Sequence, residues 1–198
     1  MFKPNGYDEA VVYDGEFKQV PKGGYICRIA KLEEGTSQSR TPMLLIYLDI
    51  AEGEFAGHYA ERYKNDTRDF PKWGCIAYQS IFDTTTGKVN PHFKSFLTAV
   101  EESNPGFVVE RTWGDDFTKF YKDKYIGFVF GDEHYIGNDG KEKVIAKPRF
   151  ARSVEKIKKG DFKIPDDTYA NGMNATAPLS MPQGFENIPT PIDDDLPF

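Results

Sequence analysis

Basic and aromatic side chains interleave along the first half of the chain, and two more arginines follow near the end of the last predicted strand. The candidates are Arg28, Lys31, Arg40, Tyr47, Tyr59, Arg62, Tyr63, Lys64, Trp73, Tyr78, Arg149 and Arg152. Cations can hold phosphate groups, and exposed rings can stack on unpaired bases whatever their identity. This mixture therefore indicates a surface able to bind a single strand of nucleic acid with little sequence preference.

Each of these candidates also has a purely structural interpretation. Tyr25 and most of the phenylalanines are expected to fill the core, because a small barrel needs large side chains inside it. Tyr47 is expected to face away from the aliphatic row of its own strand. Trp73 either faces the ligand or wedges one end of the barrel, and Arg149 and Arg152 either line a groove or solvate an edge.

The last six residues carry a different chemistry. Three aspartates, Asp193, Asp194 and Asp195, run directly into Leu196, Pro197 and Phe198. A terminal ring beside a carboxylate can fill an apolar pocket rimmed by cations, the proline limits the entropy lost on docking, and the aspartates steer the encounter. These six residues are therefore predicted to bind a partner protein.

The charge is divided unevenly along the chain. The net charge is −6, yet all 25 Lys and Arg residues lie within residues 1–165, whereas residues 166–198 contain six acidic residues and no basic one. The body is therefore neutral, which argues modestly against tight nucleic-acid binding. Residues 166–198 also contain five of the 13 prolines and almost no hydrophobic periodicity. We expect a body over 1–165 and a disordered acidic tail over 166–198.

The elements that must position the candidate rings follow from hydrophobic periodicity. Alternation predicts strands over 24–31, 43–53 and 58–66, with 75–83 as a continuation of the third. It also predicts a strand over 124–131 and a hairpin over 133–150 closed at Asn138, Asp139 and Gly140. A helix is predicted to begin at Asn90 and Pro91 and to bury Phe93, Phe96, Leu97 and Val100. The fold class is therefore mostly β, and this order fits a five-stranded Greek-key OB barrel with one helix between strands 3 and 4.

Several classes of protein have no support in the sequence. Cys27 and Cys75 lie 48 residues apart and the three histidines are scattered, so no metal site is predicted and both thiols are expected to be buried. No catalytic or cofactor-binding motif is present, so we predict a non-enzymatic protein without a cofactor. The longest apolar run, residues 43–48, is too short to span a membrane, and the N-terminus does not look like a signal peptide. We expect a cytoplasmic protein without membrane contact.

The final residues resemble the C-terminal tip of bacterial and phage single-stranded DNA-binding proteins, which ends in an acidic run followed by Ile-Pro-Phe or Leu-Pro-Phe. In the body, YIGNDGKE at 135–142 followed by KKGDFKIP at 158–165 is similar to a phage-type branch of these proteins. The resemblance implies an OB fold that coats single-stranded DNA during phage replication or recombination. It also implies recruitment of replication or recombination proteins by the tip, in the cytoplasm of a bacterial host.

Two alternatives remain open at this point. In the first, an OB-like body binds protein or RNA, and only the tail is shared with DNA-binding proteins. In the second, some of the many carboxylates hold a metal ion and the protein is a nuclease. The oligomeric state is also open, with a homo-oligomer among the outcomes.

Overall fold

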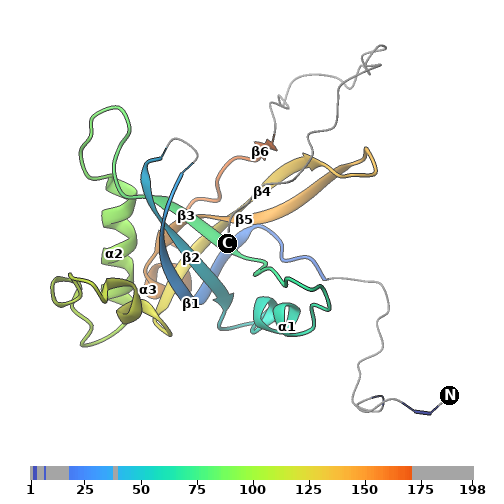
Figure 1. The fold of residues 1–198 in the computed structure, drawn as a ribbon. Helices are drawn as coiled ribbons and strands as arrows, with labels where there is room; N and C mark the ends of the chain where they lie inside the picture. The colour runs from blue at the N-terminus through green and yellow to red at the C-terminus, as the bar shows by residue number, and fades with distance from the viewer. Residues whose placement is uncertain (1, 4–6, 8–17, 38–39, 171–198) are drawn as a thin grey trace.

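The computed structural model describes residues 2–3, 7, 18–37 and 40–170. Within these ranges the chain forms six strands, three α-helices and two 3-10 helices (Figure 1). In chain order they are β1 (Gly23–Thr36), β2 (Pro42–Ile50), α1 (His58–Lys64), β3 (Ile76–Ser80), α2 (Pro91–Ser103), η1 (Val109–Arg111), η2 (Phe117–Tyr121), β4 (Tyr125–Ile136), β5 (Glu142–Arg152), α3 (Val154–Lys159) and β6 (Thr168–Tyr169).

All six strands belong to one sheet, in which five follow the order β3-β2-β1-β4-β5 with antiparallel neighbours. β6 is added to β4 in parallel. The long strand β1 pairs with β4 through residues 23–28 and with β2 through residues 27–36, with a register shift between Ile29 and Lys31. The expected mostly-β class is confirmed. The described sheet is open, however, and contains six strands instead of five.

The core lies between the inner face of the sheet and α2. Leu44, Ile46, Leu48 and Ile50 alternate along β2 and are almost fully buried. From α2 the residues Phe93, Phe96, Leu97 and Val100 face them, as their spacing predicts. The Asn90 side chain accepts a hydrogen bond from the backbone N–H of His92 at 2.9 Å, and Pro91 occupies the first turn. The predicted helix start is therefore confirmed.

The prediction of a strand over 58–66 is wrong, because these residues form helix α1. Gly57 adopts a left-handed conformation with φ of 76°, which turns the chain into the helix. The buried Asp49 carboxylate accepts hydrogen bonds from the backbone N–H groups of Tyr59 at 3.0 Å and Ala60 at 3.3 Å. These bonds satisfy donors that a first helical turn leaves unpaired. The third strand is β3, which lies within 75–83, the predicted continuation.

The predicted hairpin is confirmed: β4 and β5 form a long arm closed by residues 137–141, with Gly140 at φ of 70° (Figure 1). After α3 the chain returns to the sheet, where Thr168 and Tyr169 pair with β4. The first five residues of the expected tail, 166–170, thus lie against the body, and we call them the tail root. The remainder, 171–198, lies outside the described residues, including the six residues of the predicted docking peptide.

Gly127 in β4 is expected to tolerate no side chain, because a Cβ there would lie 2.4 Å from Ile157 Cγ1 and 2.9 Å from the carbonyl oxygens of Arg152 and Ser153. Backbone atoms cannot move aside without shifting α3. Gly127→Ala should therefore lower the free energy of unfolding by about 1–3 kcal/mol, measured by urea denaturation. Gly35→Ala is the matched control in β1, because its Cβ would meet only the end of the Leu45 side chain. Equal losses in the two variants would contradict the expectation.

Candidate nucleic-acid interface

The outer face of β1, β2 and β3 carries the rings that face away from the core. Alternation along β2 buries residues 44, 46, 48 and 50 and turns Leu45 and Tyr47 to the other side of the sheet. Directly opposed residues share a face, so their cross-strand partners join them. The resulting rows are Lys31, Tyr47 and Ile76, and Glu33, Leu45 and Tyr78. We call these six residues the outer face.

Tyr47 is held in place by two charged neighbours on the outer face. Its hydroxyl donates a hydrogen bond to Glu33 Oε2 at 2.6 Å, and the Lys31 ammonium lies 5.6 Å from its ring centroid. Partial burial and the Glu33 carboxylate raise the pKa of Tyr47 to about 12. Lys31 and the Tyr47 hydroxyl in turn lower the pKa of Glu33. Tyr47 is therefore uncharged at neutral pH, and its ring is held in the outward orientation that the sequence predicts.

Tyr78 is the most exposed ring of the outer face, with 65% of its surface accessible. It lies on β3 directly opposite Leu45 of β2. An exposed aromatic ring on a rigid strand is suited to stacking against a flat ligand.

A hollow of about 420 Å³ lies where the two ends of the sheet, β3 and β5, approach each other without pairing. Ile76 and Tyr78 line both this hollow and the outer face, so the two surfaces are continuous. We call the hollow the seam pocket; its lining consists of Trp73, Gly74, Cys75, Ile76, Tyr78, Glu133, Ile145, Ala146, Lys147, Pro148 and Arg149.

Trp73 forms a fixed wall of the seam pocket. Its indole Nε1–H donates a hydrogen bond to the backbone carbonyl of Leu48 at 2.8 Å. Its ring also lies 5.3 Å from the ring of Tyr63, which is exposed on α1. Trp73 is therefore anchored to β2 and also lines the seam pocket.

The cations of the seam pocket are already paired with a carboxylate. Lys147 forms an ion pair with Glu133, and Arg149 Nη2 lies 3.4 Å from Glu133 Oε2. Arg149 Nη2 also donates a hydrogen bond to the Thr168 hydroxyl of the tail root. A phosphate group at these cations would have to compete with Glu133, so charge alone gives this surface a limited attraction for a polyanion.

The structure gathers only part of the predicted set. Lys31, Tyr47, Trp73, Tyr78 and Arg149 lie on the outer face or around the seam pocket, with Tyr63 in contact with Trp73. Sequence reasoning missed Ile76, Ile145, Lys147 and Pro148. No local signal could have found them together, because the approach of β5 to β3 results from the path of the whole sheet.

The other predicted residues lie elsewhere. Tyr59 is 5% exposed and belongs to the core, so the expectation that it shares an open strand face with Tyr63 is wrong. Arg28 lies opposite Tyr125 of β4 and 3.7 Å from Asp123, and Arg40 lies in the loop between β1 and β2. The remaining three are Arg62 and Lys64 on α1, and Arg152, whose guanidinium lies over the Phe150 ring.

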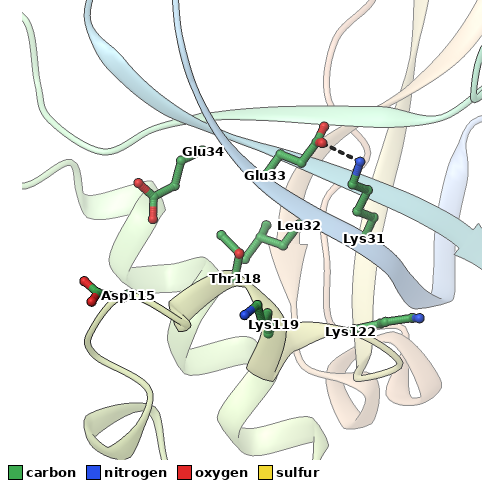
Figure 2. A pocket seen from close by; sticks show the side chains of 8 residues that line it. All are labelled: Lys31, Leu32, Glu33, Glu34, Asp115, Thr118, Lys119 and Lys122. Carbon is green, nitrogen blue, oxygen red and sulfur yellow. Dashed lines mark ion pairs between the residues drawn. The ribbon is translucent and has the colours of Figure 1, made fainter.

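A second hollow, of about 540 Å³, lies between β1 and η2 (Figure 2). Its charges balance, since three lysines and three carboxylates line it, and Figure 2 shows Lys31 paired with Glu33. The full lining is Lys31, Leu32, Glu33, Glu34, Asp115, Thr118, Lys119 and Lys122. This hollow has no net charge that would favour a polyanion.

The tail root is attached to β4 and the segment before β1 by charged and ring contacts. Asp167 accepts a hydrogen bond from the Lys22 ammonium at 2.8 Å and lies 3.6 Å from His134 Nε2, whose Nδ1 is 2.7 Å from Glu142 Oε1. The rings of His134 and Tyr169 stack with centroids 4.7 Å apart. Glu142 first, and then Asp167, raise the pKa of His134, whereas Lys22 is the main cause of the lowered pKa of Asp167.

The attachment of the tail root is expected to depend on pH. The stabilisation from His134, whose pKa is raised on folding, is fully present below its ordinary pKa of 6.5 and is lost as pH rises through the folded value. The stabilisation from Asp167, whose pKa is lowered, is present above 3.8 and is lost as pH falls through the folded value. The amide protection factor of Tyr169, measured by hydrogen exchange, should therefore be highest between these two limits.

His134→Gln is the control for this dependence, because a glutamine keeps a polar contact but does not titrate. In this variant the decline in protection above pH 6.5 should disappear. An unchanged profile in the variant would show that another group controls the attachment.

Both cysteines are buried and unpaired with each other, as the sequence predicts. Burial raises the pKa of the Cys27 thiol and of the Cys75 thiol, so both stay protonated at neutral pH. In the described ranges, no three His, Cys, Asp or Glu side chains gather closely enough to hold a metal ion. None of the helices in the described part of the chain is long and apolar enough to cross a bilayer.

The comparisons with known proteins add no assignment. No protein-family model matches the chain, and a search of curated proteins finds no match.

Proposed function

We propose that this protein binds single-stranded DNA, without strong sequence preference, on the outer face and in the adjoining seam pocket. The observation that carries the proposal is that the outer face and the seam pocket are continuous through Ile76 and Tyr78. Two outward rings, Tyr47 and Tyr78, therefore lie beside the pocket that Trp73 lines. Such rings can stack only on bases that are not already paired with a second strand. Single-stranded nucleic acid is therefore the ligand that this surface fits best.

The strand order supports an OB-type body. Along the chain, β1, β2 and β3 come before α2, and β4 and β5 come after it, while α1 lies between β2 and β3. OB folds bind oligonucleotides on strands 2 and 3 and with the loops that join strands 1 to 2 and 4 to 5. The outer face lies on the corresponding strands, and the β4–β5 arm supplies Lys147 and Arg149 to the seam pocket. We infer that the open sheet is an OB barrel whose seam lies between β3 and β5.

Stacking is expected to supply more of the affinity than charge. Lys31, Lys147 and Arg149 each have a carboxylate partner, whereas Tyr78 presents an exposed ring. One stacked base contributes about 1–3 kcal/mol. Each phosphate neutralised on a single strand adds about −0.7 to the slope of log affinity against log salt. Three cations at most would give a slope near −2, which is shallow for a protein that binds nucleic acid.

The proposed function is tested by fluorescence titration with oligo-dT and with duplex DNA of the same length. Oligo-dT should bind much more tightly, and affinities for oligo-dT and mixed single-stranded sequences should agree within a few-fold. Equal affinity for duplex would overturn the proposal. Tighter binding of the matched RNA would favour the RNA-binding adaptor, and cutting of labelled strands with magnesium or manganese would favour the nuclease.

We further propose that residues 193–198 recruit replication or recombination proteins while the body coats DNA, in the cytoplasm of a bacterial host. This part rests on the sequence of the tip and on its resemblance to phage-type single-stranded DNA-binding proteins, because the tip lies outside the described residues. The protein then acts by covering strands and recruiting partners, and no catalytic step is assigned to it.

A further inference from the structure

Arg149 has a buried nitrogen that lacks a partner. Among the described residues, its Nε is the one buried side-chain nitrogen or oxygen without a hydrogen bond. Buried donors normally find an acceptor, because leaving one unpaired costs free energy. Arg149 also lines the seam pocket. An acceptor that reached this Nε–H would be stabilised, and because the atom itself is covered, the guanidinium must shift slightly for a ligand to contact it.

The position of Arg149 in the sheet restricts its side chain. β5 shifts register here, so that Pro148 pairs with Phe130 and Phe150 with Val129, which leaves Arg149 as the extra residue of a bulge. The outer end of the guanidinium is held by Glu133 and by the Thr168 hydroxyl through Nη2. In this arrangement Nη2 is bonded, whereas the Nε–H meets no acceptor of the described protein.

The walls of the seam pocket favour a flat and largely apolar occupant. Trp73 and Tyr78 supply rings on one side, and Ile145 and Pro148 supply apolar surface on the other. The volume of about 420 Å³ lies in the range of pockets that hold small organic groups. A nucleobase has two apolar faces and carries acceptor atoms on its edge, whatever its identity.

A phosphate group fits the same pocket poorly. The Glu133 carboxylate lines the pocket and already pairs with both of its cations, Lys147 and Arg149. A phosphate there would meet a like charge and apolar walls, whereas a neutral base would meet neither obstacle. The lining of the seam pocket thus favours the base of a nucleotide over its phosphate.

We propose that the seam pocket holds one unstacked nucleobase of the bound strand, whose edge accepts a hydrogen bond from Arg149 Nε. The proposal rests on the proposed function and adds a defined subsite to it. Tyr78, which lines both the pocket and the outer face, stacks on the neighbouring base at the mouth. The affinity for a strand therefore depends far more on the base at one position than on the bases at the neighbouring positions.

The experiment uses the full chain and the shortest oligo-dT that retains full affinity, with one abasic nucleotide placed at each position in turn. In the unchanged protein, removal of the base should weaken binding most at a single position, by more than the loss of about five- to 150-fold expected for a stacked base. In Arg149→Lys, which keeps the charge but lacks the Nε–H, the intact oligonucleotide should bind more weakly. The same abasic substitution should then cost little.

Lys147→Gln is the matched control, since Lys147 lines the same pocket and pairs with the same carboxylate. It should change the affinity for all oligonucleotides alike and keep the position dependence. Ala146→Leu narrows the pocket without altering Arg149 and should abolish the position dependence, with a melting curve to confirm that each variant is folded.

The outcomes separate the subsite from the function itself. If Arg149→Lys weakens binding but the large loss at one abasic position persists, or if the unchanged protein shows no such position, the subsite is overturned while DNA binding stands. If the unchanged protein fails to bind oligo-dT, the proposed function is overturned as well.

Discussion

Replacing Tyr78 by alanine is expected to lower the affinity for oligo-dT by about 1–3 kcal/mol, or five- to 150-fold, with the melting temperature almost unchanged. The ring is 65% exposed, so truncation removes a stacking surface and little of the core. Tyr47→Ala should cause a loss of the same order, with a small additional loss of stability because Tyr47 also bonds to Glu33. Fluorescence anisotropy titrations and melting curves on the same samples measure both quantities.

Two further variants separate binding from folding. Phe130→Ala removes a fully buried ring and should cost about 3–5 kcal/mol of stability. Tyr59→Ala should likewise act on stability, because Tyr59 is the buried residue of α1. Normal affinity in both Tyr47→Ala and Tyr78→Ala would place the DNA on another face of the sheet.

Deleting residues 189–198 is expected to abolish the capture of replication or recombination proteins and to leave DNA binding intact. The deletion removes three aspartates and the Leu-Pro-Phe tip, but no basic residue and no part of the described body. Affinity for oligo-dT should stay equal or rise, most visibly at low salt, since fewer carboxylates then compete with the DNA. Pull-down from a lysate of the host, together with oligo-dT titration, measures the two effects.

Deleting Phe198 alone should reduce capture nearly as much as the full truncation, because the ring is the apolar anchor of the tip. Asp193→Asn serves as the comparison, since it removes one steering charge and keeps the anchor. Capture that survives the loss of Phe198, or DNA binding that fails on truncation, would refute the recruitment role of these residues.

Most strands and the main helix of this fold could be predicted from local patterns. Alternation along β2 identified its core row and the outward position of Tyr47, and the Asn90–Pro91 pair marked the start of α2. The hairpin turn at Asn138, Asp139 and Gly140 likewise follows from turn chemistry. These features depend on residues within one turn or a few positions of each other.

Helix α1 could not be predicted in this way, because a spacing of four residues is ambiguous. Tyr59 and Tyr63 fall on one side of a strand, which repeats every two residues, and also on one side of a helix, which repeats every 3.6. Asp49 at the end of β2 and the left-handed Gly57 determine the outcome. Asp49 acts through a contact between positions ten residues apart, which no local period reveals.

The seam pocket depends on still more distant contacts. Trp73 and Tyr78 could be proposed as exposed rings from sequence alone, but their approach to Lys147 and Pro148 results from the path of the whole sheet. Arg149 was a candidate because of its charge. Its buried Nε depends on the bulge in β5, which the sequence pattern does not reveal.

The short strand β6 also covers part of the edge of β4 that β1 leaves free. β1 pairs with β4 only as far as Phe130, so the same edge of β4 would continue beyond that point with unpaired backbone groups. β6 covers this edge at Glu133 and His134. An open edge of this kind is a template for strand pairing between molecules. If the protein coats DNA as proposed, many copies would lie along one strand and bring such edges close together. Covering this edge with the first residues of the acidic tail would then limit strand pairing between copies.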